Sequence, residues 1–247
     1  MLIRRAFVRE ERLSDAEREE WPFTVPCVAQ LIGHGLEFKQ PITFLVGENG
    51  SGKSTVVEAL AEAFGLDAHG GRAGRKYVND RPKTALGEVL ELDLTTQGAR
   101  MKSSHRLKQK GYFLRAETAF GLMSFVSGMA GYWEQDTAML SHGEGFLTVF
   151  DTMFTAPGFY IMDEPEAPLS FTSCLRLIGL MHELAADGAQ IVCATHSPLL
   201  AATPEADIIE MGDHGVRRLP WEELDIVDHW RRYLNNPNAY LRHVTAR

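Results

Sequence analysis

The stretch Gly47–Thr55 constrains the fold more than any other part of the chain. It reads Gly-Glu-Asn-Gly-Ser-Gly-Lys-Ser-Thr and contains the P-loop pattern G-x-x-x-x-G-K-[ST]. The glycines let successive backbone N–H groups curl around a phosphate, because a Cβ atom there would clash. Such a loop works between a strand and a helix. Residues 41–46 are a short apolar run, and 54–64 carry apolar residues at helical spacing before Gly65. The sequence therefore predicts a strand, a phosphate-binding loop and a helix over 41–65.

Lys53 and Ser54 carry the chemistry that this loop predicts. A lysine at this position reaches the β- and γ-phosphates of a nucleotide, and the serine hydroxyl coordinates Mg²⁺. The helix that begins near Lys53 adds the positive end of its dipole. We therefore expect Lys53 to serve in both binding and catalysis. The other predicted nucleotide contacts are Gly47, Glu48, Asn49, Gly50, Ser51, Gly52 and Thr55.

Two further apolar runs end in residues that suit phosphate chemistry. Asp163 and Glu164 follow the run 159–162, and His196 follows the run 191–195. A carboxylate at the C-terminal end of a buried parallel strand can point at the metal ion of a bound nucleotide. Asp163 is therefore the predicted Mg²⁺ ligand, and Glu164 is the predicted base for an attacking water. His196 is expected to contact the γ-phosphate or that water. The alternatives are an ordinary acidic turn and a structural histidine.

The rest of the pattern predicts a single α/β domain, residues 1–247. A helix over 175–186 separates two of the apolar strands, and strands alternating with helices imply a mostly parallel central sheet flanked by helices. We expect a β-rich N-terminal part and an inserted, helical subdomain over 67–140. The further expected elements are strand material over 27–38, a strand over 88–94, a hairpin over 207–219 and a helix over 221–234.

Composition excludes three classes of protein. The 247 residues are 45% hydrophobic with a formal net charge of -8, which excludes a disordered chain. The cysteines, Cys27, Cys174 and Cys193, are 3 in number and widely spaced, which excludes a disulfide scaffold and suits a reducing compartment. No apolar stretch approaches the roughly 18 to 20 residues of a membrane helix, and no signal-peptide core is present. We expect a soluble, cytoplasmic protein without membrane insertion.

The negative net charge hides one basic stretch. Residues 67–115 carry 11 Lys and Arg against 5 Asp and Glu. On one face, these cations would neutralise several phosphates of a nucleic acid. The alternative is a solvated basic loop, or one that pairs with the acidic surface of the same chain. The cations that would contribute most are Arg72, Arg75, Lys76, Arg100, Lys102, Arg106, Lys108 and Lys110.

Together these motifs resemble those of the ABC-type ATPases, the superfamily of transporter motors and SMC-like DNA-maintenance ATPases. The matching segments are the P-loop Gly47–Thr55, the Walker B segment Tyr160–Pro165, the switch Thr195–Ser197, and Leu140–Glu144, which is similar to the signature motif LSGGQ. The resemblance implies a P-loop NTPase fold of the ABC type with a helical signature subdomain, ATP and Mg²⁺ as ligands, and hydrolysis of ATP to ADP and phosphate. It also implies a homodimer that sandwiches two ATP molecules head to tail, in which Ser141 and Gly143 of one subunit contact the γ-phosphate held by the other.

Several positions depart from the family pattern. His142 and Glu144 replace the usual glycine and glutamine of the signature, and Glu166–Ser170 lacks the usual aspartate after Walker B. The residue in place of the family's Q-loop glutamine is Gln109, or else Arg115 or Glu117. The aromatic residue that stacks on adenine is Phe23 or Phe38. These departures resemble the stand-alone ATPases of the SMC-like branch. Only 87 residues separate Lys53 from Leu140, which leaves no room for a long coiled-coil arm.

The predicted function is that of a compact ATPase that dimerises on ATP and drives a conformational change in a partner. Nucleic acid, in repair or defence, is one candidate partner through residues 67–115, and another protein is a second. Two alternatives stay open: the motor subunit of an ABC transporter, and a nucleotide-gated switch with low turnover.

Overall fold

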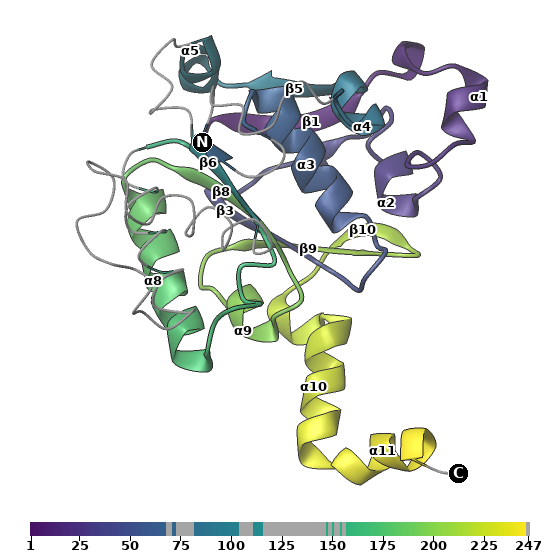
Figure 1. Ribbon diagram of the computed structural model, residues 1–247, viewed down its shortest axis with the longest axis vertical. Helices are drawn as coiled ribbons and strands as arrows, with labels where there is room; N and C mark the ends of the chain where they lie inside the picture. Colours follow the sequence, from purple (N-terminus) through teal and green to yellow (C-terminus); the bar gives the residue numbers. More distant parts are fainter. Residues whose placement is uncertain are drawn as a thin grey trace.

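The computed structural model describes residues 1–67, 71–72, 82–103, 111–115 and 157–245, together with Leu147, Phe150 and Phe154. In this part of the chain two β-sheets are combined with helices that cover them (Figure 1). The helices are α1 (Asp15–Arg18), α2 (Pro26–Ala29), α3 (Lys53–Phe64), α4 (Ala85–Val89), α5 (Thr96–Ser103), α8 (Phe171–Ala186), α9 (Pro198–Ala201), α10 (Asp225–Asn235) and α11 (Pro237–Thr245), with short 3-10 turns η1 (Glu10–Arg12) and η4 (Trp221–Glu223). The strands are β1 (Ile3–Val8), β2 (Leu36–Glu37), β3 (Ile42–Val46), β4 (Gly71–Arg72), β5 (Leu90–Leu94), β6 (Gly111–Arg115), β7 (Phe159–Asp163), β8 (Gln190–Thr195), β9 (Asp207–Gly212) and β10 (Gly215–Arg218).

The larger sheet is mostly parallel. Among the described residues its strand order is β10-β9-β3-β8-β7-β6-β4, and the strands from β9 to β6 run parallel to one another. The outermost pairs, β10 with β9 and β4 with β6, are antiparallel. In register, Val46 pairs with Thr195 and Asp163 pairs with Ala194. The C-terminal ends of β3, β8 and β7 therefore lie side by side at one edge of the sheet.

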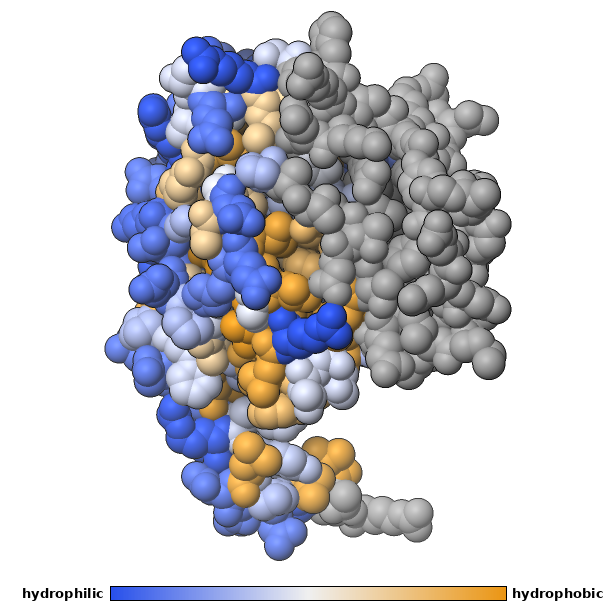
Figure 2. All heavy atoms as spheres, turned by 90° about the vertical axis from the view of Figure 1, so that its left-hand side faces the viewer, coloured by the Kyte–Doolittle hydropathy of each residue, from blue (hydrophilic) through white to orange (hydrophobic). Residues whose placement is uncertain are grey.

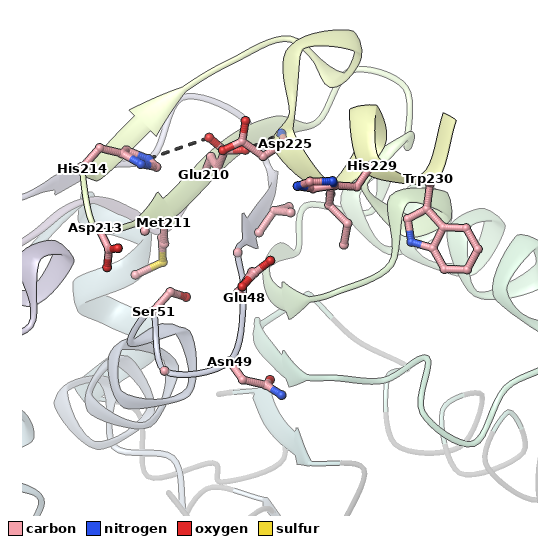
Figure 3. Close-up of a pocket in the computed structure, with 15 residues that line it drawn as sticks. Glu48, Asn49, Ser51, Glu210, Met211, Asp213, His214, Asp225, His229 and Trp230 are labelled. Atoms are coloured by element: carbon pink, nitrogen blue, oxygen red, sulfur yellow. Dashed lines mark hydrogen bonds and ion pairs between the residues drawn. The ribbon is translucent and has the colours of Figure 1, made fainter. Parts of the chain in front are cut away.

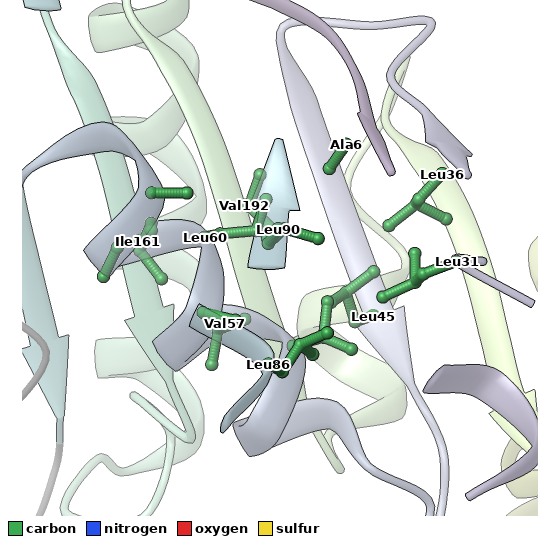
Figure 4. Close-up of a cluster of buried hydrophobic side chains, with 14 of the residues drawn as sticks. Ala6, Leu31, Leu36, Leu45, Val57, Leu60, Leu86, Leu90, Ile161 and Val192 are labelled. Atoms are coloured by element: carbon green, nitrogen blue, oxygen red, sulfur yellow. The ribbon is translucent and has the colours of Figure 1, made fainter. Parts of the chain in front are cut away.

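Alternate residues of the central strands face two separate hydrophobic cores. In β3, Leu45 packs with α3 and the smaller sheet, whereas Phe44 and Val46 pack with α8. The same alternation occurs in β7, where Ile161 and Met162 face opposite cores. Figure 4 shows the first core between α3, the central strands and the smaller sheet. Burial on both faces explains why these strands read as continuous apolar runs in the sequence.

The smaller sheet is antiparallel, with strand order β2-β1-β5. Gln190, at the start of β8, joins it to the larger sheet. Its Oε1 accepts hydrogen bonds from the backbone N–H groups of Leu2 (2.7 Å) and Ile3 (2.8 Å), and its Nε2 donates to the Ile3 carbonyl oxygen (3.0 Å). Gln190 is fully buried, so one amide satisfies three backbone groups that would otherwise be buried without partners.

The structure confirms most of the predicted elements. The strands expected at 41–46, 159–162 and 191–195 are β3, β7 and β8, and the helices expected at 54–64 and 175–186 are α3 and α8. The hairpin expected at 207–219 is β9–β10, and the helix expected at 221–234 is η4 with α10. The strand expected at 88–94 is β5 from Leu90 onward, whereas residues 88 and 89 belong to helix α4.

Two expectations change. The strand predicted from residue 27 is wrong, because the chain forms helix α2 there with Pro26 in its first turn, where the fixed φ of proline favours a helix. Within 67–140, β5 pairs with β1 in the smaller sheet and β6 pairs with β7 in the larger one. The rest of that range, including the expected helical signature subdomain after Arg115, lies outside the described residues and stays a prediction.

Helices α10 and α11 project away from the two sheets (Figure 1). Val227 is the buried residue of α10. Apolar side chains are exposed along the pair, and Figure 2 shows apolar atoms on the projecting part. The exposed residues are Trp230, Leu234, Leu241 and Val244. In the part of the chain that the structure describes, no helix is both long and apolar enough to span a bilayer.

Candidate functional site

The loop between β3 and α3 rests on α2. Gly50 and Gly52 have φ angles of 84° and 95°, a left-handed conformation that glycine adopts without strain. Cys27 Sγ donates to the Ser51 carbonyl oxygen at 2.6 Å, and a Cβ atom on Gly52 would lie 2.6 Å from the same sulfur. Burial raises the pKa of Cys27 to about 11, so the thiol keeps the proton that this contact needs. Gly52 is thus required for two reasons: its backbone has a positive φ angle, and a side chain there would clash with Cys27 of α2.

Lys53 is the first residue of α3, and its side chain folds back over the loop. Its Nζ donates to the carbonyl oxygens of Gly47 (2.7 Å) and Glu48 (2.9 Å), and 4% of the residue is exposed. Burial lowers the pKa of Lys53, while the nearby carboxylates of Glu164 and Asp163 raise it. The ammonium group is a compact point charge beside the loop, which suits a phosphate oxygen.

Ser54 and Asp163 bring α3 and β7 together. Ser54 Oγ donates to Asp163 Oδ1 at 3.1 Å, and Asp163 is 6% exposed. Burial raises the pKa of Asp163, whereas the Arg115 cation and the Ser54 hydroxyl lower it. Arg115 Nη2 lies 3.6 Å from Asp163 Oδ2, and its Nη1 lies 2.5 Å from Glu58 Oε1. A serine hydroxyl beside a buried carboxylate is a donor set that Mg²⁺ takes together with phosphate oxygens and water.

No group of three His, Cys, Asp or Glu side chains in the described ranges is arranged to hold a metal ion. Mg²⁺ is commonly bound through one or two carboxylates and the phosphates of its substrate, and Asp163 beside Ser54 Oγ offers such a carboxylate. The residues present therefore fit the expected ion.

Glu164 and His196 lie next to each other at the ends of β7 and β8. His196 Nε2 is 3.0 Å from Glu164 Oε1, and the Glu164 side chain is 43% exposed. The Glu164 N–H donates to the Ala194 carbonyl oxygen at 2.9 Å. The φ angle of Glu164 is 51°, which is unusual for a residue other than glycine. The backbone of Glu164 is thus strained, and in this conformation its carboxylate contacts the His196 imidazole and remains accessible to solvent.

Glu166 is a site residue that the sequence did not single out as functional. Its Oε1 accepts hydrogen bonds from Thr195 Oγ1 (2.6 Å) and from the His196 N–H (2.7 Å). It therefore ties the segment after β7 to the segment after β8 and fixes the backbone that carries His196. In the sequence, Glu166 opens the segment Glu166–Ser170, which lacks the usual aspartate after Walker B. A carboxylate two residues after a candidate catalytic one was the available signal.

Five predicted residues meet at one edge of the larger sheet, and we name them the phosphate-side cluster. They come from the start of α3 and from the C-terminal ends of β7 and β8, and they lie beside the glycine-rich loop. The cluster consists of Lys53, Ser54, Asp163, Glu164 and His196.

Other predicted residues lie outside the described part of the chain, among them Ser141, Gly143, Gln109 and Glu117. Of the basic stretch 67–115, α5 carries Arg100 and Lys102, and most of the remaining cations lie outside the described residues.

The expectation that Phe23 or Phe38 stacks on a base is wrong. These side chains are 5% and 3% exposed and belong to the core between α3 and the smaller sheet. A ring with so little exposed surface has no face left for a ligand. Aromatic residues near the loop must be sought elsewhere.

Two protein-family profiles match the chain. The family described as "AAA domain, putative AbiEii toxin, Type IV TA system" matches residues 79–202, half of the chain, and the family described as "AAA domain" matches residues 32–123. Among curated proteins, the "Ribose import ATP-binding protein RbsA 1" of Burkholderia ambifaria is 28% identical over 210 residues, which cover 77% of this chain and 39% of that protein. The matched residues span only 22% to 39% of the length of such curated relatives.

Solved structures resemble the fold. An ATP-binding cassette of an ABC transporter in its ADP conformation is 14% identical, with a TM-score of 0.50 over 99% of each chain. An SMC head domain from Thermotoga maritima is 18% identical, with a TM-score of 0.45 over 75% of this chain and 92% of that one. The predicted α/β P-loop fold of the ABC-ATPase type, with its mostly parallel sheet and β-rich N-terminal part, is confirmed.

Proposed function

The chain belongs to the AAA/ABC-type P-loop ATPases, and on that premise we propose that it binds ATP with Mg²⁺ and hydrolyses it to ADP and phosphate through the phosphate-side cluster. The observation that carries the proposal is the pair of contacts at the strand ends, Ser54 with Asp163 at 3.1 Å and Glu164 with His196 at 3.0 Å. The first pair has the chemistry of a magnesium site, and the second has the chemistry of a general base with a partner.

In the proposed reaction the chain binds the phosphates first. The N–H groups of the glycine-rich loop, Lys53 Nζ and the N-terminus of α3 hold the β- and γ-phosphates. Ser54 and Asp163 would hold Mg²⁺, which neutralises charge on the phosphate oxygens. The Gly47 and Glu48 carbonyl oxygens that Lys53 contacts keep its ammonium group beside the loop until a phosphate competes for it.

Glu164 then activates the water. Its carboxylate accepts a proton as the water oxygen bonds to the γ-phosphorus, and the bond from that phosphorus to the β,γ-bridging oxygen breaks to release ADP. His196, 3.0 Å from Glu164, orients the carboxylate and contacts the transferred phosphate. Glu166 positions His196 by accepting its backbone N–H.

We further propose that two copies of the chain close head to tail around two ATP molecules, with Ser141 and Gly143 of each copy reaching the other's γ-phosphate. The Glu164 side chain is 43% exposed, whereas catalysis requires the attacking water to be shielded from bulk solvent. A second copy of the chain that closes over Glu164 would supply this shielding, which supports the dimer. A turnover per subunit that rises with protein concentration would support the dimer. A constant turnover from a protein that stays monomeric would rule it out.

The partner is proposed to be that of a stand-alone, SMC-like ATPase, with nucleic acid as the first candidate. The basic stretch 67–115 and the departures in the signature segment support this role. The printed name of the ribose import relative favours the second candidate, the ATP-binding subunit of a transporter. Stimulation of ATP turnover by DNA or RNA, weakened steeply by salt, supports the first candidate. Stimulation by membranes alone supports the second.

Replacing Glu164 by Gln tests the hydrolysis. The amide keeps the size of the carboxylate but takes no proton, so phosphate release should fall about 100-fold or more while ATP still binds. Glu183→Gln is the matched control, because Glu183 is an exposed residue of α8 remote from the loop. An unchanged turnover in Glu164→Gln would overturn the assignment of the base. A wild-type chain that binds ATP but scarcely hydrolyses it would leave the nucleotide-gated switch as the function.

A further inference from the structure

A pocket of about 720 Å³ adjoins the glycine-rich loop, and we name it the α10 pocket (Figure 3). Its walls are the first half of the loop, the β9–β10 turn and α10, including Glu48, Asn49, Asp213, His214, His229 and Trp230. In the larger sheet β9 flanks β3 on one side, whereas β8 and β7, which carry His196 and Asp163, lie on the other. The pocket and the phosphate-side cluster therefore share the loop but none of their other residues.

The helix that forms one wall is anchored by a buried carboxylate. Glu210 of β9 is 3% exposed, and its Oε1 accepts the N–H of Asp225, the first residue of α10, at 2.8 Å. Its Oε2 lies 2.5 Å from Arg217 Nη2 of β10. A carboxylate at the N-terminus of a helix also complements the helix dipole. These contacts fix the start of α10 against β9, so the position of this wall is determined by the fold.

The charges that line the pocket are negative. Four carboxylate residues line it, and no Lys or Arg is among the lining residues. Arg217 Nη2 lies 2.5 Å from Glu210 Oε2 and 3.5 Å from Asp225 Oδ2, so its single positive charge leaves a net negative charge on the four carboxylates. A phosphate group would be repelled there, whereas hydroxyl and amino groups could donate hydrogen bonds to the carboxylates. The pocket thus suits the uncharged end of a ligand whose charged end lies near Lys53.

The same wall carries two adjacent aromatic residues. Trp230 is 48% exposed, and its ring meets that of Tyr233 edge to face, with centroids 6.4 Å apart. His229 Nδ1 is 3.2 Å from Tyr240 Oη of α11, so the imidazole also contacts the last helix. In Figure 3 the labelled His229 ring points toward the pocket, and Trp230 lies at its rim. A large exposed aromatic surface beside a phosphate-binding loop suits a flat heterocycle.

We propose that the ribose and base of the nucleotide occupy the α10 pocket, with the base packed against His229 and Trp230. The inference rests on the proposed function in one respect, that the triphosphate binds at the loop and Lys53. It extends that function by assigning recognition of the nucleoside to a helix more than 170 residues further along the chain than the loop.

Calorimetric binding of two probes, ATP and inorganic tripolyphosphate, tests the proposal, each in the presence of Mg²⁺. Trp230→Ala should weaken ATP binding by about 5-fold to 100-fold, the range expected for losing one base–aromatic stack, and leave tripolyphosphate within about 2-fold. Trp230→Phe should keep most of the ATP affinity but lose a large part of the fluorescence change that ATP causes. Trp21→Phe is the control, because Trp21 is 70% exposed and does not line the pocket.

Unchanged ATP affinity in Trp230→Ala would overturn the proposal, because the base would then bind elsewhere. Equal losses for ATP and tripolyphosphate would also overturn it, because α10 would then act only as structural support. Lys53→Ala tests the proposed function separately, and it should weaken both probes. If Lys53→Ala weakens neither, the phosphate site itself is misassigned, whatever Trp230 does.

Discussion

The two sides of the glycine-rich loop are built in different ways. The phosphate-side cluster is compact: Lys53 and Asp163 are 4% and 6% exposed, and Ser54 contacts Asp163 as Glu164 contacts His196. The α10 pocket is open, and its aromatic wall is supplied by a helix that projects from the sheets. One side is built on the ends of buried strands, and the other on a helix that is held by the buried carboxylate of Glu210 and by Val227 in the hydrophobic core.

This difference indicates that the two sides have different roles, one in phosphate chemistry and the other in binding the base. To stabilise the charge on the reacting phosphate, hydrogen-bond donors and carboxylates must be held rigidly and away from bulk water. The ends of buried strands hold side chains in this way. Binding a flat, uncharged base requires an apolar or aromatic surface and a few hydrogen-bond acceptors, which a helix outside the sheets, such as α10, can supply. Substitutions on the phosphate side should therefore change turnover, whereas substitutions on the other side should change ATP affinity.

The largest effect is expected for Asp163→Asn. The amide would be a poor Mg²⁺ ligand, so Mg²⁺-dependent ATP turnover should fall by about two to three orders of magnitude. Folding should be little affected, because burial already disfavours the Asp163 charge and Arg115 keeps its contact with Glu58 at 2.5 Å. Phosphate release and thermal unfolding check both parts. If the two sides are independent, ATP should still change the Trp230 fluorescence of this variant.

An intermediate effect is expected for Glu166→Ala. The substitution leaves Thr195 Oγ1 and the His196 N–H without their acceptor, so the segment that carries His196 loses its fixed position. Turnover should fall about 10-fold while the ATP dissociation constant changes by less than about 3-fold, since His196 acts on the reacting end. Glu166→Gln keeps an acceptor oxygen and should restore most of the turnover. A loss of ATP affinity equal to the loss of turnover would contradict a positioning role.

The smallest effect is expected for Glu210→Gln. The amide oxygen still accepts the Asp225 N–H but loses the ion pair with Arg217, so α10 is held less firmly. We expect the melting temperature to fall by about 2 to 4 °C and ATP affinity by about 2-fold, with turnover at saturating ATP unchanged. Glu222→Gln, at an exposed position of η4, is the control. A drop in turnover at saturating ATP would show that the two sides are coupled.

The phosphate side was predictable because its information is local. Glycines, a lysine and a serine follow β3 within a few residues, and Asp163 and His196 directly follow buried apolar runs. Parallel strands bring such ends to one edge of the sheet, so sequence position becomes spatial proximity. Glu166 escaped prediction because its role depends on the register between β7 and β8, which no single segment encodes.

The other side was not predictable from short motifs. Nothing near Trp230 in the sequence indicates that α10 starts from an anchor on β9, since the contact joins residues 15 positions apart across a hairpin. The burial of Phe23, which excludes it as a stacking residue, depends on tertiary packing that its neighbours in the sequence do not encode. A short apolar run has the same composition in a strand and in a helix, so the run from Cys27 does not by itself predict helix α2, which is favoured by Pro26 in its first turn.

The positive φ angle of Glu164 has a consequence for the mutational freedom of this position. A residue with a side chain in that conformation costs about 1 kcal/mol or more in folding free energy, and glycine would relieve this cost. Glycine would also remove the proposed base. Selection for stability and selection for hydrolysis thus favour different residues at position 164, and a chain freed from the need to hydrolyse ATP would be expected to drift toward the more stable one.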